Sequence, residues 1–266
     1  MMQTAARWTL LAIFLAMLGA SAIAPWPYDR QFREETAAAP SARHPLGTDA
    51  LGRDRLSRLL YGGRISILLA PAAALVSVSI AILMACGAAL LGGWWERVAS
   101  ALIDLFLSLP WLFLLLAVRG LLPLNTSPGV SLGVTFALLG LLGWAGPARV
   151  MMAAAKRQLE SDYILMARAS GCGTWRLAAA HLAPNLAPVT LAQFWTTAPA
   201  FLLSEANLAL LGLGIAEPLP SWGSLLRELS NVTLVPQQPW LAAPLVLLVI
   251  TLGCCQLARA ADEYSL

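Results

Sequence analysis

Six stretches of this sequence run for 17 to 31 residues with at most one ionisable side chain each. A membrane-spanning helix needs roughly 20 mostly apolar residues, and in lipid every backbone polar group must be satisfied within the spanning structure. Strands of a membrane barrel would be about half as long and would alternate in polarity. We therefore expect an all-α integral membrane protein with six transmembrane helices. The six runs are Trp8 to Ala24, Ile65 to Trp95, Val98 to Val118, Gly120 to Ala148, Leu177 to Ser204 and Leu229 to Ala258.

The composition agrees with a chain whose solvent is the lipid bilayer. Only 12% of its residues are charged and 59% are hydrophobic, whereas soluble domains carry about 25% charged residues. The net charge of +3 is small and spread along the chain, so we expect no nucleic-acid partner.

The first run is open to two interpretations. Ala22, Ile23 and Ala24 fit the cleavage site of a secretory signal, while Trp8 and the segment Pro25 to Tyr28 are typical of interfacial anchors of a retained helix. We expect an uncleaved first transmembrane helix over 1–24, and either interpretation leaves residue 30 outside.

Counting cations does not orient the chain. With the amino terminus inside, eight Lys and Arg residues would be cytoplasmic and nine external, because segment 25–64 alone carries seven arginines against five acidic residues. The positive-inside rule therefore gives no answer.

The first of three polar islands is segment 44–64. Gly47 and Gly52 permit tight turns, and Asp49 suits an Asx turn or a helix N-cap. From Arg53 onward the leucines fall on one helical face and the charges on the other. This periodicity predicts a short amphipathic helix on the membrane surface, with an ordinary solvated connector as the alternative. The charged residues expected to point away from the membrane are Asp54, Arg55 and Arg58.

The second island, 149–190, has the pattern of two short helices, each followed by a stop. Residues 161–170 are helical in composition, and Gly171 is well placed as a left-handed C-cap. Thr174 can N-cap a second helix that Pro184 ends or kinks. With Trp175 and Arg176 near its tip, this knob is suited to docking into another protein, because aromatic and arginine side chains dominate interface hot spots.

The third island follows the fifth run. It contains Leu211 to Gly214 and Pro218 to Gly223, whose glycines and prolines predict a rigid, non-helical exit from the membrane. Residues Ser224 to Ser230 could form a second surface helix.

Together the islands resemble the permease subunits of peptide-type ABC importers, the dipeptide, oligopeptide and nickel group, over roughly residues 44–255. The second island is similar to that family's cytoplasmic loop named for its Glu-Ala-Ala sequence, and the third to its Leu-Gly-Leu-Gly and Pro-Ser-Trp-Gly motifs. The first looks like its Gly-Thr-Asp-x-Leu-Gly-Arg-Asp signature, here Gly47, Thr48, Asp49, Gly52, Arg53 and Asp54.

The resemblance implies the type I ABC importer permease fold in the bacterial inner membrane. Both termini and the loop 149–190 would be cytoplasmic, and segments 25–64 and 214–238 external. The permease domain would cover 65–266, with a coupling loop at about 156–190 seated in a groove of an ATP-hydrolysing subunit. The implied coupling residues are Ala167, Gly171, Thr174, Trp175, Arg176, His181 and Pro184, of which His181 is expected to pack the loop.

The resemblance also implies a function. ATP-driven alternating access would move peptides inward between this chain and a second homologous permease. Two ATP-binding subunits would hold ATP and Mg, so no cofactor is expected in this chain, which would not itself be an enzyme. An external solute-binding protein would deliver the cargo, and nickel or another small solute stays open as the alternative.

Two departures from the family pattern concern the coupling loop and the carboxyl terminus. Leu165, Met166 and Ala167 stand where Glu-Ala-Ala is usual, so the acidic anchor is missing. The carboxyl terminus lacks the usual Gly-Asp-x-Leu-Arg-Asp ending.

Two acidic residues, Asp104 and Glu205, are expected within the membrane spans. Ionisable groups in a membrane suggest function by default, so Glu205, with neighbouring Asn207, is expected either to line the translocation path or to make a structural hydrogen bond between helices. Asp104 lies nearer the end of its run and is the weaker candidate.

Other classes of protein fit less well. An intramembrane serine protease needs a His in a span, and a membrane metalloprotease needs His-Glu-x-x-His; His44 and His181 provide neither. The four cysteines form no metal-spaced pair, so no metal site is expected. A membrane scaffold without transport activity is the remaining alternative.

Overall fold

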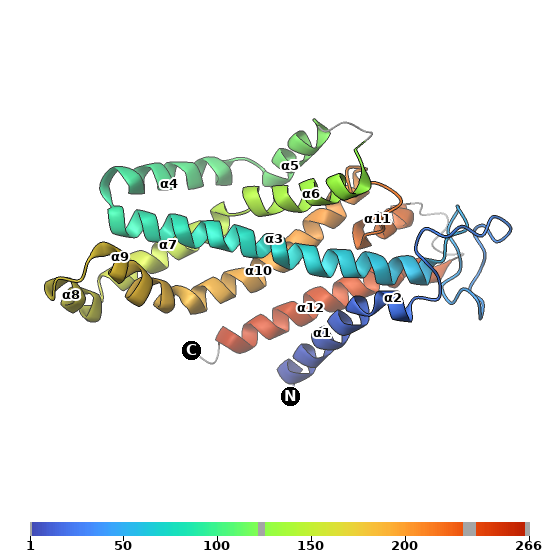
Figure 1. Cartoon of the computed structure of the whole chain (residues 1–266), viewed down its shortest axis with the longest axis horizontal. Coiled ribbons are helices and arrows are strands. Elements are labelled where there is room, and N and C mark those ends of the chain that lie inside the picture. Colours follow the sequence, from blue (N-terminus) through green and yellow to red (C-terminus); the bar gives the residue numbers. More distant parts are fainter. Residues whose placement is uncertain (1, 122–125, 231–237, 264–266) are drawn as a thin grey trace. The chain divides into compact units, whose positions relative to one another are not determined.

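The computed structural model describes residues 2–121, 126–230 and 238–263, which are mostly helical outside segment 24–54 (Figure 1). Parts of two predicted spans, Gly120 to Ala148 and Leu229 to Ala258, and the end of the predicted external segment 214–238 lie outside the described residues. The α-helices are α1 (Met2–Leu18), α2 (Ala20–Ile23), α3 (Arg55–Leu91), α4 (Gly93–Ser108), α5 (Trp111–Gly120), α6 (Pro128–Leu142), α7 (Ala145–Leu159), α8 (Asp162–Ala169), α9 (Thr174–Arg176), α10 (Ala183–Leu210), α11 (Trp222–Leu226) and α12 (Ala243–Glu263). A π-helix, η1 (Leu177–Leu182), and two 3₁₀ helices, η2 (Arg227–Ser230) and η3 (Pro239–Ala242), complete the described elements.

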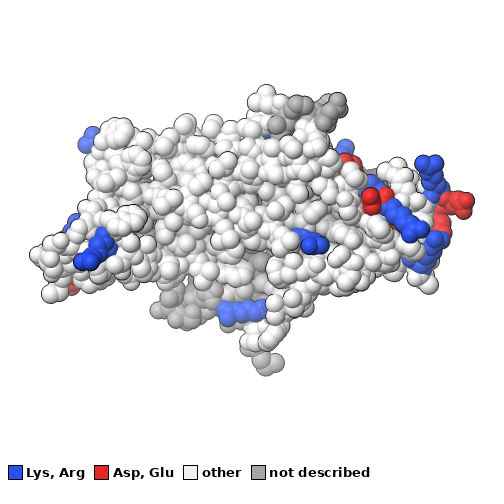
Figure 2. Space-filling model, viewed as in Figure 1, with Lys and Arg blue, Asp and Glu red and all other residues white. Residues whose placement is uncertain are grey.

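The chain divides into two compact units. Unit 1 comprises residues 1–70, 119–136 and 199–266, and unit 2 comprises 71–118 and 137–198. Figure 2 shows charged side chains over the loops of segment 24–54 in unit 1 and near α8 and α9 in unit 2, with few on the long helices.

Apolar helices long enough to cross a membrane confirm the all-α membrane architecture. Among the described residues four helical stretches meet that length, and a fifth is reached if α4 and α5 count as one broken span. The apolar helix α1 is shorter, at 17 residues. The predicted number of six is therefore not confirmed by length alone. The four stretches are Arg55–Leu91, Pro128–Leu159, Thr174–Leu210 and Pro239–Ala258.

The predicted span Val98 to Val118 is not one straight helix. α4 and α5 are bent by 80° relative to each other. Pro110 lies at the break, and Leu109 before it has an extended backbone (φ −82°, ψ 130°). Proline lacks an amide hydrogen and disfavours helical geometry in the preceding residue, so the helix breaks here. A count of uncharged residues does not reveal such a break.

The predicted amphipathic surface helix is not a separate element. α3 runs without interruption from Arg55 to Leu91, so the expected boundary at residue 65 falls inside a helix. Its Gly63 lies against α1 and α11: a Cβ there would meet Met17 Sδ at 2.2 Å and Trp222 Nε1 at 2.8 Å. The first turns of α3 are thus packed inside unit 1 rather than laid on a surface.

In unit 1, α1 and α12 lie side by side, and the two termini are at the same end (Figure 1). The loops of segment 24–54, the start of α3 and α11 lie at the opposite end of that unit. If unit 1 crosses a membrane, the termini and these loops are therefore on opposite sides.

The core of unit 2 is built from small residues. Fully buried alanines of α3 face α4 and α7, and small side chains allow helices to approach closely in a membrane. Asp104 of α4 and Arg149 of α7 form an ion pair, and Lys156 of α7 bonds Glu96 of α4 at 2.5 Å. The buried core residues are Val78, Ala81, Ala85, Ala88, Ala99, Ile103, Trp144, Ala148, Met151 and Met152.

Candidate functional site

Two glycines set the path of the first island, in unit 1. Gly47 and Gly52 have φ of +70° and +72°, in the left-handed region that glycine adopts without steric cost. A Cβ would lie 2.3 Å from the carbonyl oxygen of Ala38 at Gly47, and 2.2 Å from that of Phe32 at Gly52. Only glycine fits at either turn, as the sequence predicted.

Asp49 forms the Asx turn expected of it. Its Oδ1 accepts hydrogen bonds from the backbone N–H groups of Leu51 and Arg53, both at 2.9 Å, and its Oδ2 accepts from Arg53 Nε at 2.7 Å. The N-cap of α3 is instead Asp54, whose Oδ2 accepts from both N and Oγ of Ser57 at 2.7 Å.

Buried polar side chains fasten the preceding loop to this turn. Thr48 Oγ1 accepts from the backbone N–H of Ala38 at 2.9 Å and donates to the carbonyl of Glu35. His44 is buried with Nδ1 2.9 Å from Asp54 Oδ1. Its Nε2 lies 2.9 Å from Glu35 Oε2, close enough for charge pairing but without hydrogen-bond alignment.

Glu217 joins the first island to the third. Its carboxylate accepts hydrogen bonds from Arg53 Nη1 at 2.6 Å and from Arg58 Nη2 at 3.1 Å, although Arg53 is 164 residues away in the chain. Burial alone would lower the pKa of the Arg53 guanidinium, but the hydrogen bonds and charges of Asp49 and Glu217 raise it on balance. The six signature residues and Glu217 thus form one network.

The predicted exposure of the charges at the start of α3 was wrong for two residues. Asp54 and Arg58 are each 1% exposed, because Asp54 caps the helix and Arg58 bonds Glu217. Glu217 was not among the residues predicted from the sequence. The one available signal was the excess of arginine over acidic residues in segment 25–64. Such an excess indicates that an acidic residue from another part of the chain pairs with one of these arginines.

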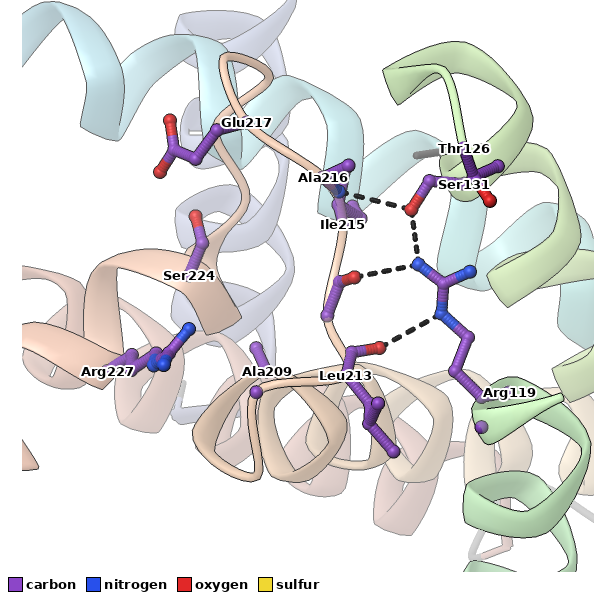
Figure 3. A pocket seen from close by; sticks show the side chains of 13 residues that line it. Arg119, Thr126, Ser131, Ala209, Leu213, Ile215, Ala216, Glu217, Ser224 and Arg227 are labelled. Carbon is purple, nitrogen blue, oxygen red and sulfur yellow. Dashed lines mark hydrogen bonds between the residues drawn. The ribbon is translucent and has the colours of Figure 1, made fainter. Parts of the chain in front are cut away.

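Arg119, at the end of α5, fastens the Leu-Gly-Leu-Gly segment (Figure 3). Its Nε donates to the carbonyl of Leu213 at 3.1 Å, and its Nη2 donates to that of Gly214 at 2.9 Å and to Ser131 Oγ on α6. Ser131 Oγ also accepts from the backbone N–H of Ala216 at 3.1 Å. These residues border a cavity of about 290 Å³ within unit 1. Neither Arg119 nor Ser131 was among the site residues predicted from the sequence.

Glu205 is buried in α10 and bonded to the Pro-Ser-Trp-Gly motif. Ser221 Oγ donates to Glu205 Oε1 at 2.6 Å, and the Gly223 N–H donates to Oε2 at 3.3 Å. A Cβ at Gly223 would lie 2.8 Å from Oε1, so this contact needs glycine. The contacts favour the structural alternative for Glu205, whereas the predicted companion Asn207 is exposed.

The predicted surface helix over Ser224 to Ser230 differs in the structure. α11 starts at Trp222, with Ser221 as its N-cap in a capping box with Ser224, and 3₁₀ helix η2 follows. Trp222 and Leu225 are buried, because α11 packs into unit 1, where the backbone N–H of Trp222 donates to Ser66 Oγ at 3.3 Å.

The knob, residues 162–182 of unit 2, is built as the second island predicts. Gly171 has φ +78° and ends α8 in a Schellman motif: its N–H donates to the carbonyl of Arg168, and that of Cys172 donates to Ala167, both at 3.0 Å.

Two details of the knob differ from the prediction. The N-cap of α9 is Gly173 rather than Thr174, and no side chain caps the helix there. Pro184 does not end the helix, since Thr174–Leu210 is one continuous stretch. The π-helix η1 precedes it, and such an insertion accommodates a residue that has no amide hydrogen to donate.

The knob presents a large apolar surface. Trp175 is 83% exposed and Met166 72%, while Ile164 and Leu182 point inward and are fully buried. Arg176 is also exposed, and His181 is half-buried. The remaining predicted coupling residues lie on the same segment, with Ala167 half-buried and Gly171, Thr174 and Pro184 exposed.

Comparison with known proteins relates the chain to transport permeases. It is 31% identical over 219 residues to a dipeptide transport system permease protein of Bacillus subtilis, covering 82% of this chain and 67% of that protein. It is 32% identical to an oligopeptide transport system permease protein of Escherichia coli K12 (92% and 79%). It is 35% identical to a di/tripeptide transport system permease protein of Pseudomonas aeruginosa (82% and 72%).

The chain spans about two thirds of the length of several relatives, including 65% of a putative peptide permease protein of Brucella suis. Residues 77–258 match the family described as binding-protein-dependent transport system inner membrane component. That match covers more than half of the chain and includes the knob, α11 and the Leu-Gly-Leu-Gly segment. The chain therefore belongs to the family of inner-membrane components of binding-protein-dependent transport systems.

Proposed function

We propose that this chain is the permease subunit of an ABC importer that carries peptides across the inner membrane, and that its knob couples it to separate ATP-hydrolysing subunits. Support for the cargo comes from the relatives, which carry the names of dipeptide, di/tripeptide and oligopeptide permeases. The observation that carries the coupling role is Trp175, 83% exposed at the tip of a rigid two-helix knob.

The proposed complex contains a second homologous permease, two ATP-binding subunits that hold ATP and Mg, and an external binding protein that delivers cargo. Alternating access between the two permeases would follow ATP binding and hydrolysis. The termini and the knob would be cytoplasmic. The ends of the chain and the signature loop lie at opposite ends of unit 1, which supports placing them on opposite sides of the membrane.

The coupling role follows from the energetics of an exposed tryptophan. An aromatic anchor that fills a partner's pocket commonly accounts for about 2 kcal/mol or more of binding free energy, or about thirtyfold in affinity. Leu165 and Met166 of α8 are both exposed, and Leu165 stands where the acidic residue of Glu-Ala-Ala is usual. We infer that the receiving groove binds this knob mainly through apolar contacts.

The cargo assignment is tested by uptake of a labelled dipeptide and of labelled nickel in cells with and without this chain. Loss of peptide uptake alone supports the proposal. Loss of nickel uptake alone reassigns the chain to a metal importer, and no change in either removes both cargo assignments.

The coupling assignment is tested with Trp175→Glu and Gly171→Pro. Proline cannot adopt φ +78° and lacks the N–H that closes the Schellman motif, so the second variant breaks the knob without touching Trp175. Both should abolish ATP-driven uptake while membrane insertion persists. Trp94→Glu is the matched control, because Trp94 is also in unit 2 and 71% exposed. Normal transport by both knob variants would disprove the coupling role.

A further inference from the structure

The cavity beside the Leu-Gly-Leu-Gly segment in unit 1 is lined by two arginines, Arg119 and Arg227. Neither forms an ion pair with a carboxylate among the described residues. We propose that this cavity binds a carboxylate group, and that its ligand is the C-terminal carboxylate of the peptide cargo. The cargo part of this inference rests on the proposed function; the anion site itself rests on the side chains described below.

Arg119 is a nearly buried cation whose acceptors are all neutral. It is 9% exposed, and its three hydrogen bonds end on two carbonyl oxygens and one hydroxyl. Nη1 makes no hydrogen bond among the described residues. A charge removed from water is costly unless it is paired as well as hydrogen-bonded, so an anion in the cavity would stabilise this arrangement.

Glu217 is the acidic residue lining the cavity, but it is already engaged. Its carboxylate holds both Arg53 and Arg58, at 2.6 Å and 3.1 Å. It therefore does not neutralise Arg119 or Arg227, and the positive charge of the lining exceeds the negative charge.

Arg227 is the cation available to a ligand. It is exposed at the start of η2 and forms no ion pair or hydrogen bond with any described residue. In Figure 3 its guanidinium lies with Ser224 and Glu217 on one side of the segment Leu213–Ala216, and Arg119 lies on the other. Arg227 also borders a second cavity of about 270 Å³, so ligand atoms could reach it from either space.

The shape of the site suits the end of a short peptide. Its volume of about 290 Å³ is near the lower end of the roughly 300–1,000 Å³ typical of ligand pockets. Gly212 and Gly214 line its wall, and a Cβ at Gly212 would be in ordinary van der Waals contact with Arg227 Nη2 at 3.8 Å. Arginine is the residue best matched to a planar carboxylate, through two parallel hydrogen bonds.

The test is the rate at which phenylglyoxal modifies Arg227 in the purified complete importer, mapped by mass spectrometry. The protectants are alanyl-alanine, its C-terminal amide and acetate, at equal concentration. A ligand at about four times its dissociation constant occupies four fifths of the sites, so alanyl-alanine should slow modification about fivefold. The amide and acetate should have little effect, and Arg33, an exposed arginine of the same unit, should be modified at an unchanged rate.

Uptake measurements separate this inference from the proposed function. In cells lacking other peptide importers, Arg227→Gln should lower alanyl-alanine uptake about fivefold, Arg227→Lys much less, and Arg33→Gln not at all. If the wild-type chain supports no peptide uptake, the proposed function fails, while the protection result still decides whether the anion site exists.

Four outcomes would overturn the inference. Absence of protection by alanyl-alanine would show that the cavity takes no peptide. Equal protection by the amide would exclude recognition of the carboxylate, and equal protection by acetate would leave an anion site that does not select cargo. Arg227→Gln could also lower the uptake of alanyl-alanine and of its amide equally, while neither compound protects Arg227 from phenylglyoxal. That result would assign Arg227 to docking of another protein.

Discussion

Replacing Gly52 by alanine should lower the stability of the protein more than replacing Gly171 by alanine. Both glycines have positive φ, +72° and +78°, so both variants incur the left-handed penalty of about 1–2 kcal/mol for an L side chain. A smaller gain of about 0.4–1 kcal/mol from the stiffer unfolded chain partly offsets it. Gly171→Ala, whose Cβ would have nothing within 4 Å, should therefore cost about 1 kcal/mol.

Gly52→Ala adds a steric term to this penalty. The new Cβ would lie 2.2 Å from the carbonyl oxygen of Phe32 and 2.8 Å from its carbon, so the Phe32 backbone must move away by about 1 Å to reach van der Waals contact. This movement breaks the hydrogen bond from Phe32 N–H to the Gly52 carbonyl, now 2.8 Å, and leaves both groups short of partners at about 1–3 kcal/mol. Added to the penalty of about 1 kcal/mol, this gives a total of about 2–4 kcal/mol.

The assay is thermal unfolding of the purified complex in mild detergent, followed by a thiol-reactive fluorophore that reports exposure of buried Cys255. At about 2–4 °C per kcal/mol for a chain of this size, Gly52→Ala should lower the midpoint by about 4–16 °C and Gly171→Ala by about 2–4 °C. Equal shifts in the two variants would refute the reasoning, because the steric term would then be absent.

Two further predictions concern the charge network of unit 1. Glu217→Ala should lower stability by about 1–3 kcal/mol, less than the 3–5 kcal/mol of a fully buried pair because the Glu217 side chain is 55% exposed; thermal unfolding should show no such loss for exposed Glu34→Ala. Burial, and secondarily Asp49, raise the pKa of the Glu228 carboxyl above its ordinary 4.5 against the opposing charge of Arg55, so the folded state holds this proton more tightly. The contribution of this bound proton to the stability of the fold is therefore full below pH 4.5 and is lost as the pH rises through the raised pKa of Glu228. The unfolding midpoint of the wild type should then fall relative to that of Glu228→Gln over that window, and parallel pH profiles would contradict the assignment.

The helical, membrane-spanning character of the chain could be predicted from sequence because it depends on a property of each segment alone. Uncharged length is local, and so is the backbone requirement behind Gly47, Gly52 and Gly171, which all have positive φ. Segment ends were less predictable. The apolar run across Pro110 hides an 80° bend, and α3 continues through Gly63, against which Met17 of α1 and Trp222 of α11 pack.

The residues that the sequence did not reveal are those whose role depends on distant partners. Arg58 falls on the polar face of a helical projection, and nothing local shows that Glu217 lies beside it. Arg119 follows an apolar run and would be expected at a helix end, yet it holds Leu213 and Gly214, more than 90 residues later. Pairing of charges across such separations depends on tertiary structure, which single-sequence periodicity does not contain.

The contacts also divide the three sequence islands into two physical groups. The first and third islands belong to one unit, joined by Glu217 and by the hydrogen bond from Trp222 N–H to Ser66 Oγ. The second island belongs to the other unit and has its own buried contacts, through Ile164 and Leu182. A substitution in the signature network therefore changes contacts that the knob does not share, and Trp175 has no role in holding the network. Stability effects at sites without shared partners are expected to add, so recognition of cargo and docking of the ATP-hydrolysing subunits should be separable by mutation in this chain.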